Sequence, residues 1–174
     1  MRYEWGDYAF DGAVTVGRPS VDVLRWLMAP DCMSRWIVGL DAVTLLDSQP
    51  DVVGAQTRLD FGPGRLSPGT FRGEVVELSD QTLIRRYRPG FDADKYERTV
   101  RYDLRSIGAA TGLRCSVRTR LLGANPTVLS RLPTRGERVH LHHCLKRLCS
   151  LAEGKQRPPL LRRIRDSRLA PQPL

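Results

Sequence analysis

The stretch from Arg98 to Leu121 constrains the fold most, because apolar and polar residues alternate along two successive runs. The apolar face carries Val100, Tyr102 and Leu104, then Leu113, Cys115, Val117, Thr119 and Leu121. Polar residues, mostly arginines, fill the positions between them. A period of two is typical of antiparallel strands with one buried face and one solvated face. The segment Ser106–Gly112, which contains two glycines, is predicted to form the turn between them.

A helix over about Thr134–Ala152 is the best candidate to cover the apolar face of this hairpin. Its apolar stripe recurs at three- and four-residue spacings, at Leu141, Leu145, Leu148 and Ala152. Thr134 and Glu137 have the spacing of a capping box, in which the glutamate bonds back to the amide of the capping residue. Gly154 is a suitable stop.

The rest of the chain has the turn residues and spacings of short strands and helices. Strands are predicted over Phe10–Val16, Asp41–Leu46, Val53–Phe61, Thr70–Leu78 and Thr82–Arg88. Two short helices are predicted between the first and second strands, over Val21–Met28 and from the capping residue Asp31 to about Trp36. The predicted order is therefore strand, two helices, six strands and a long helix, which is an α+β arrangement.

Three local features accompany this order of elements. Arg18-Pro19-Ser20 follows the first strand, the second short helix runs into Trp36-Ile37-Val38-Gly39, and Gly54-Ala55 falls at the third strand. With these features, the chain over about residues 8–153 resembles the SRPBCC superfamily. That superfamily includes START lipid-transfer domains, the birch-pollen allergens and the polyketide cyclase/dehydrase-like group, to which the chain is most similar.

The resemblance implies a helix-grip fold, in which a curved seven-stranded antiparallel sheet wraps around the long C-terminal helix. It also implies an apolar cavity between the sheet and that helix. The superfamily has no universal catalytic residue, so no catalytic residue is assigned, and no cofactor is expected.

Composition and charge indicate the domain boundaries and the cellular compartment. With 174 residues, one domain over residues 1–154 is expected, followed by a basic, disordered tail over 155–174 that carries +5 of the net charge of +9. No apolar run reaches the roughly 20 residues of a membrane span, and the N-terminus lacks the apolar core of a secretory signal. The four cysteines show no CxxC spacing, which indicates reduced thiols in a cytoplasmic protein.

The candidate ligand-binding residues are those that the alternation and the helix stripe turn toward the cavity. They are Trp36, Arg85, Tyr87, Tyr102, Leu104, Cys115, Val117, Thr119, Leu141 and Leu145. The buried hydroxyls of Tyr102 and Thr119 need partners, either in the protein or in a ligand. Trp36 either wedges the short helix against the sheet or lines the cavity.

Arg85 belongs to a strand with two competing registers. If Leu83, Arg85 and Tyr87 point inward, one arginine is buried, whereas the opposite register buries Arg86 and Arg88. Burying one charge costs less than burying two, so the first register is favoured. Arg85 then suits a carboxylate or an enolate oxygen of a ligand, unless an internal acid pairs with it or a strand twist exposes it.

Three histidines and a cysteine, His140, His142, His143 and Cys144, lie close together on the predicted last helix. A metal site needs three or four ligands on one face, and no second cluster supports one, so no metal is expected. His140 and His143 lie mostly off the apolar stripe, which predicts solvent exposure. His142 lies nearer the edge of the stripe and is the histidine expected to touch the cavity.

Arginines dominate the predicted outer face of the sheet, at Arg86, Arg88, Arg101, Arg105, Arg114, Arg118 and Arg120. This face suits an acidic partner, but it has almost no aromatic residues for stacking on bases, which weighs against nucleic acid. In the tail, Leu160, Leu161 and Ile164 lie among arginines, as in a short helix with weak affinity for an anionic membrane. A soluble, disordered tail is the alternative.

The predicted function is the binding of an apolar or aromatic small molecule, lipid-like or polyketide-like, in the cavity. The alternative is a polyketide cyclase or dehydratase in which Arg85 and Tyr102 polarise carbonyl groups. The lack of an obvious acid–base pair favours the binder, and a weaker third hypothesis is a basic interaction module. The sequence gives no indication of oligomeric state.

Overall fold

The computed structural model describes residues 8–47, 49, 51–62, 69–90, 96–122 and 134–155. In chain order, the elements are β1 (Tyr8–Val16), α1 (Ser20–Met28), α2 (Pro30–Trp36), β2 (Leu40–Leu45), β3 (Gln56–Phe61), β4 (Gly69–Leu78), β5 (Thr82–Pro89), β6 (Tyr96–Ile107), β7 (Ala110–Leu121) and α3 (Thr134–Ala152). This is the predicted order of elements.

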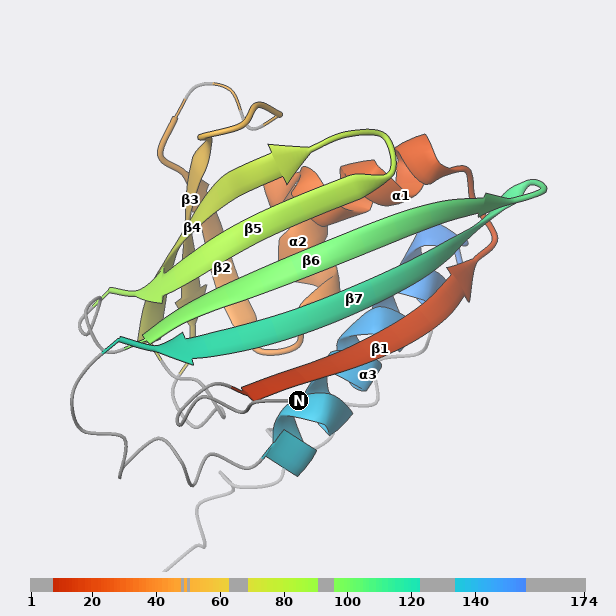
Figure 1. Cartoon of the computed structure of the whole chain (residues 1–174). Helices are drawn as coiled ribbons and strands as arrows, with labels where there is room; N and C mark the ends of the chain where they lie inside the picture. The colour runs from red at the N-terminus through yellow and green to blue at the C-terminus, as the bar shows by residue number, and fades with distance from the viewer. Residues whose placement is uncertain are drawn as a thin grey trace, which may run out of the picture.

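The seven strands form one antiparallel sheet in the order β1-β7-β6-β5-β4-β3-β2. The three helices lie on the same face of this sheet, and the long helix α3 runs along β1 (Figure 1). A curved sheet wrapped around a C-terminal helix, with two short helices after the first strand, is the helix-grip arrangement that the sequence predicted.

The β6–β7 hairpin has the predicted register and a tighter turn. Val100 pairs with Val117 and Tyr102 with Cys115, and all four side chains are buried on the inner face. The strands continue to Ile107 and resume at Ala110, so the turn is shorter than the predicted Ser106–Gly112. Gly108 makes this possible, because its φ of 60° lies in the left-handed region that two-residue hairpin turns use.

Two other predicted boundaries are wrong for local reasons. The strand β3 begins at Gln56 rather than Val53, because Gly54 adopts a φ of 91° in the preceding turn, which an extended strand does not accommodate. The helix α2 begins at Pro30, and its capping position is Ala29, with no side-chain cap. Asp31 is therefore in the first helical turn, where its charge suits the helix dipole.

The contact between α3 and β1 depends on a glycine. A Cβ atom on Gly12 would lie 3.1 Å from Leu145 Cδ1 and 3.4 Å from Leu141 Cδ2. Since the strand carries no side chain there, the helix can approach it closely. Leu145 and Leu148 are completely buried, so the predicted apolar stripe does face the sheet.

The C-terminal end of α3 is fixed to the segment that follows β1. The Arg18 Nε atom donates to the Ala152 carbonyl oxygen at 2.8 Å, and the Gly17 amide donates to Glu153 Oε1 at 2.7 Å. Lys155, together with that amide, lowers the pKa of Glu153 to about 2. The bond from Arg18 satisfies a carbonyl group that a helix end otherwise leaves without a partner.

The predicted basic tail falls mainly on residues 156–174, which lie outside the described part of the chain. Its disorder and its affinity for anionic membranes therefore stay predictions. Among the described helices, none combines the length and the apolar character needed to cross a membrane.

Candidate functional site: a cavity between the sheet and α3

A cavity of about 320 Å³ lies between the inner face of the sheet and the helices. Aromatic and aliphatic side chains form most of its wall, namely Phe10, Trp36, Ile37, Val38, Leu59, Phe61, Phe71, Tyr87, Val100, Tyr102, Val117 and Leu141. Two cysteines, Cys115 and Cys144, complete this wall. Of the described residues in the lining, only Arg98, Glu137 and His140 add charged or imidazole groups.

Six of the ten predicted site residues line this cavity: Trp36, Tyr87, Tyr102, Cys115, Val117 and Leu141. The other four, Arg85, Leu104, Thr119 and Leu145, are buried but lie outside the lining. Leu104 pairs with Leu113 near the β6–β7 turn, and Leu145 packs against Gly12. The Thr119 hydroxyl accepts a hydrogen bond from Arg98 Nε at 3.2 Å, so its partner is in the protein.

Arg85 is buried as the favoured register predicted, with 1% of its surface exposed. Within the described part of the chain, its Nε and Nη2 atoms have no hydrogen-bond partner. Its guanidinium acts on the Tyr87 hydroxyl by charge and hydrogen bonding. Arg85 is therefore a buried cation next to Tyr87, which lines the cavity, and two of its nitrogen atoms have no described hydrogen-bond partner.

The two tyrosines of the wall are kept protonated by their surroundings. Burial raises the pKa of Tyr87, and the positive charge of Arg85 opposes this rise. Burial raises the pKa of Tyr102 well above its usual value, and Cys115 and Tyr87 add to the effect. Both phenols can thus donate a hydrogen bond to a ligand oxygen at neutral pH.

A second polar group lies where α3 begins. The Arg98 Nη2 atom donates to Glu137 Oε1 at 2.6 Å and to the Tyr8 hydroxyl oxygen at 3.1 Å. The Tyr8 hydroxyl donates to the same Glu137 oxygen at 3.3 Å. Burial lowers the pKa of Arg98, but Glu137 and Tyr8 outweigh this effect, and the pKa is raised overall. This network joins β1, β6 and α3 across one side of the cavity.

The contacts of Glu137 that the structure describes are long-range. Its Oε1 atom is engaged by Arg98 and Tyr8, and its buried Oε2 atom has no hydrogen-bond partner among the described residues. The capping box predicted for Thr134 and Glu137 stays a prediction, since the residues just before α3 lie outside the described part of the chain.

The thiols and the nearby histidine form a weakly polar part of the wall. The Cys144 Sγ atom lies 3.6 Å from His140 Nε2 and accepts a hydrogen bond from the Val38 amide at 3.4 Å. Burial raises the pKa of Cys144 and of Cys115. The thiols are therefore protonated and poor nucleophiles.

The histidine at the cavity is His140, whereas the sequence favoured His142, which is exposed together with His143. The described residues contain no group of three or more His, Cys, Asp or Glu side chains that could hold a metal ion.

Trp36 combines the two roles considered for it. Its ring lines the cavity, and its Nε1 atom donates to the Trp26 carbonyl oxygen at 2.8 Å. Since only 3% of Trp36 is exposed, the residue also fixes α2 against α1. A buried indole whose N–H is satisfied by the protein presents only its apolar surface to a ligand.

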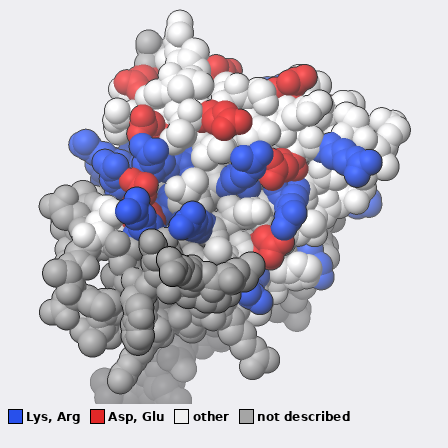
Figure 2. All heavy atoms as spheres, in the orientation of Figure 1, with Lys and Arg blue, Asp and Glu red and all other residues white. Residues whose placement is uncertain are grey.

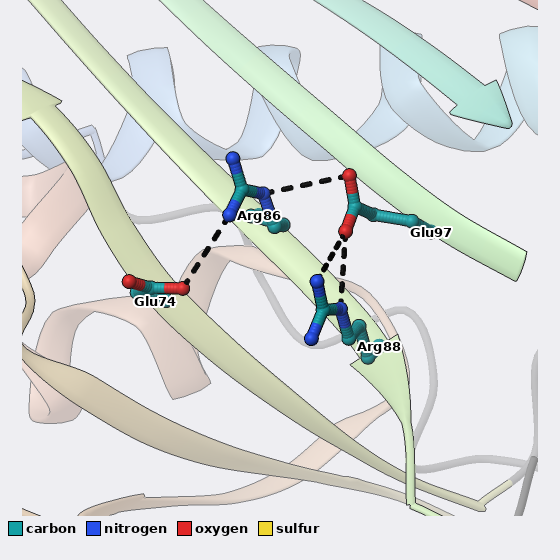
Figure 3. Close-up of polar contacts among 4 residues, drawn as sticks. All are labelled: Glu74, Arg86, Arg88 and Glu97. Atoms are coloured by element: carbon teal, nitrogen blue, oxygen red, sulfur yellow. Dashed lines mark hydrogen bonds and ion pairs between the residues drawn. The ribbon is translucent and has the colours of Figure 1, made fainter. Parts of the chain in front are cut away.

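The opposite face of the sheet carries the predicted arginines, with acidic residues between them (Figure 2). Glu97 lies between Arg86 and Arg88, and Arg86 also reaches Glu74 (Figure 3). Arg101 pairs with Asp103, and Arg114 pairs with Asp11. Much of the positive charge on this face is therefore balanced by neighbouring carboxylates.

Sequence reasoning missed Arg98, Glu137 and His140 as cavity residues. A signal for Arg98 was present, since it has the same parity as Val100 and Tyr102 on β6. No comparable signal marks Glu137 in the sequence, because its partners come from β1 and β6.

No protein-family model matches the chain, and no curated protein matches it in sequence. Solved structures do resemble it in fold. Ara h 8.0201 has a TM-score of 0.65 and 11% identity, with 86% of this chain and 99% of that chain covered. Norcoclaurine synthase from Thalictrum flavum, in complex with dopamine and hydroxybenzaldehyde, has a TM-score of 0.62 and 11% identity, covering 87% of this chain and 90% of the other.

A third similar structure is StfQ, a di-domain ARO/CYC protein from the steffimycin biosynthetic pathway. Its TM-score is 0.66 at 13% identity, and the match covers 86% of this chain and 51% of StfQ. At these identities the likeness concerns the fold. The chain shares the helix-grip fold of these proteins, which is the fold that the resemblance in its sequence predicted.

Proposed function

We propose that this protein binds an apolar or aromatic small molecule, lipid-like or polyketide-like, in the cavity between the sheet and α3. The observation that carries the proposal is the cavity of about 320 Å³ with its mainly aromatic and aliphatic wall. Ligand pockets in proteins typically have volumes of about 300–1,000 Å³, apolar walls and a few polar groups that orient the ligand. Tyr87, Tyr102 and Glu137 are such groups here.

A substitution that fills the cavity tests this proposal. Val117 lies on the wall in the middle of β7, and Val117→Trp should abolish binding of a fluorescent apolar probe. A matched control is Val21→Trp on α1, where the side chain is 71% exposed and should leave binding unchanged. Circular dichroism establishes that both variants are folded. Full probe binding by a folded Val117→Trp protein would reject the cavity as the site.

A second candidate function is a cyclase or dehydratase that acts on a polyketide-like chain in the same cavity. Two protonated phenols backed by the Arg85 cation favour it, because such donors stabilise the developing charge on an enolate oxygen. Two of the similar structures are also named as a synthase and an ARO/CYC protein. Turnover of a poly-β-ketone substrate, followed by mass spectrometry, separates this candidate from simple binding.

The third hypothesis, a basic interaction module, has less support, because carboxylates balance several arginines of the outer face. For location, we favour the reducing cytoplasm, because all four cysteines are free. Weak contact of the tail with an anionic membrane stays a prediction, since it concerns residues outside the described part.

A further inference from the structure

Glu137 lines the cavity, and its buried Oε2 atom has no hydrogen-bond partner in the described chain. The other oxygen, Oε1, accepts from Arg98 Nη2 at 2.6 Å and from the Tyr8 hydroxyl at 3.3 Å. Buried polar atoms in native proteins are nearly always hydrogen-bonded, and each exception calls for an explanation. A ligand with a hydrogen-bond donor would supply the missing partner.

The charge of Glu137 decides what kind of donor fits. Its carboxylate is already balanced by Arg98, which is 19% exposed at the side chain and firmly paired. A cationic ligand would therefore add a net positive charge to a mostly apolar enclosure, which is costly. A neutral hydroxyl group supplies the donor without the charge.

The neighbouring polar groups do not replace Glu137 in this role. His140, one turn further along α3, faces the Cys144 thiol with its Nε2 atom. Tyr87 and Tyr102 are protonated phenols, which serve first as donors. Among the described residues that line the cavity, Glu137 is the one with a carboxyl oxygen left for a donor.

We propose that Glu137 Oε2 accepts a hydrogen bond from a hydroxyl group of the ligand, so that the cavity selects hydroxylated aromatic or alicyclic molecules. The inference rests on the proposed binding function. Glu137 thereby determines specificity, while Arg98 and Tyr8 hold it in position from the other side.

Naphthol and its methyl ether, methoxynaphthalene, test this inference with the full-length protein. The two probes have the same rings, but the ether has no donor and would place a methyl group against Oε2. A site built to bond a hydroxyl rejects the analogue that lacks it. In fluorescence titrations at neutral pH, wild-type protein should bind naphthol about tenfold more tightly.

Glu137→Gln should remove this preference. Arg98 can only donate, so it should hold the carbonyl oxygen of the new amide and turn the NH₂ group toward the cavity. The cavity then presents a donor, and the ratio of the two affinities should fall to about one. Glu97→Gln is the matched control, because Glu97 pairs with Arg86 and Arg88 on the opposite face and should leave the ratio at its wild-type value (Figure 3).

The outcomes separate the inference from the function on which it rests. If wild-type protein binds both probes equally, or if Glu137→Gln keeps the preference, the inference is overturned and the binding function stands. If wild-type protein binds neither probe, both fall. Should Glu137→Gln fail to fold, Glu137→Asp is the second variant. It keeps a negative charge opposite Arg98, but its side chain is one methylene group shorter, so the oxygen without a partner lies further from the ligand. That variant should also lower the ratio, and an unchanged ratio would overturn the inference.

Discussion

Two arginines point inward from neighbouring strands, and their surroundings differ. Arg98 on β6 has a carboxylate and two hydroxyls as partners, from Glu137, Tyr8 and Thr119. Arg85 on β5 is more deeply buried, at 1% exposed, and forms no ion pair with any described residue. Arg98 joins α3 to the sheet through Glu137, whereas Arg85 is a buried charge next to the cavity whose Nε and Nη2 atoms have no described partner.

This difference indicates two separate uses of a buried cation. A paired charge is satisfied within the protein and contributes to holding the fold together. An unpaired charge costs stability, and proteins tend to retain such costs at functional sites. The same substitution at both positions, arginine to methionine, can therefore distinguish structure from function, because methionine keeps much of the apolar stem and removes the charge.

The largest effect is expected for Arg98→Met. It leaves Glu137 buried with its charge uncompensated, and breaking a buried pair in this way typically costs about 3 kcal/mol or more. The free energy of unfolding, measured by urea denaturation, should fall by about that amount. Arg98→Lys keeps the charge but cannot supply separate Nε and Nη2 donors to Thr119 and Glu137. Its loss of stability should therefore be smaller than that of Arg98→Met.

A loss below about 1 kcal/mol for Arg98→Met would contradict this account, since such a value is typical of a solvent-screened surface pair. The comparison between the two inward arginines would then have no energetic basis.

The fold could be predicted from the sequence because its signals are local and repeated. Alternation placed Val100, Tyr102 and Val117 on the buried face, and the cost of burying a charge selected the register of Arg85. The turn at Gly108 was predicted too long, because the composition of Ser106–Gly112 does not reveal which residue adopts positive φ.

The candidate site could be predicted only in part, because a cavity is not a packed core. Along α3, the apolar stripe correctly turned Leu145 toward the sheet, but this residue packs against Gly12 and does not line the cavity as predicted. Where the helix borders an open space, however, residues off the stripe can also face inward, as His140 does. Glu137 has its local capping spacing, but the partners that decide its role are distant in the sequence.

Arg85→Met should have an intermediate effect, and this effect should be on ligand affinity rather than on a loss of stability. Removal of an unpaired buried cation should leave the free energy of unfolding unchanged or raise it. Affinity for naphthoate should fall several-fold relative to neutral methoxynaphthalene, because the positive charge behind Tyr87 is lost. Parallel urea denaturation and fluorescence titrations measure both quantities.

A clear loss of stability in Arg85→Met would mean that a protein carboxylate meets this arginine. If the affinity ratio and the stability both stayed the same, Arg85 would have no part in the site.

The smallest effect is expected for Arg88→Met on the outer face. Arg88 donates to Glu97 Oε2 through Nε and Nη2, at 3.0 and 2.8 Å, so this ion pair has two hydrogen bonds where that of Arg98 with Glu137 has one (Figure 3). Its side chain is 52% exposed, however, and Glu97 keeps Arg86 as a second partner. Water and salt screen such pairs, which typically contribute about 0–1 kcal/mol.

The free energy of unfolding of Arg88→Met should therefore stay within about 1 kcal/mol of the wild-type value. The difference from wild type should shrink further as salt is added, whereas the loss in Arg98→Met should persist. Glu97 and Arg98 are adjacent residues on β6, so the two pairs differ chiefly in the face of the sheet on which they lie. Equal losses in the two variants would show that burial is not what separates the pairs, and the contrast between the two faces would fail.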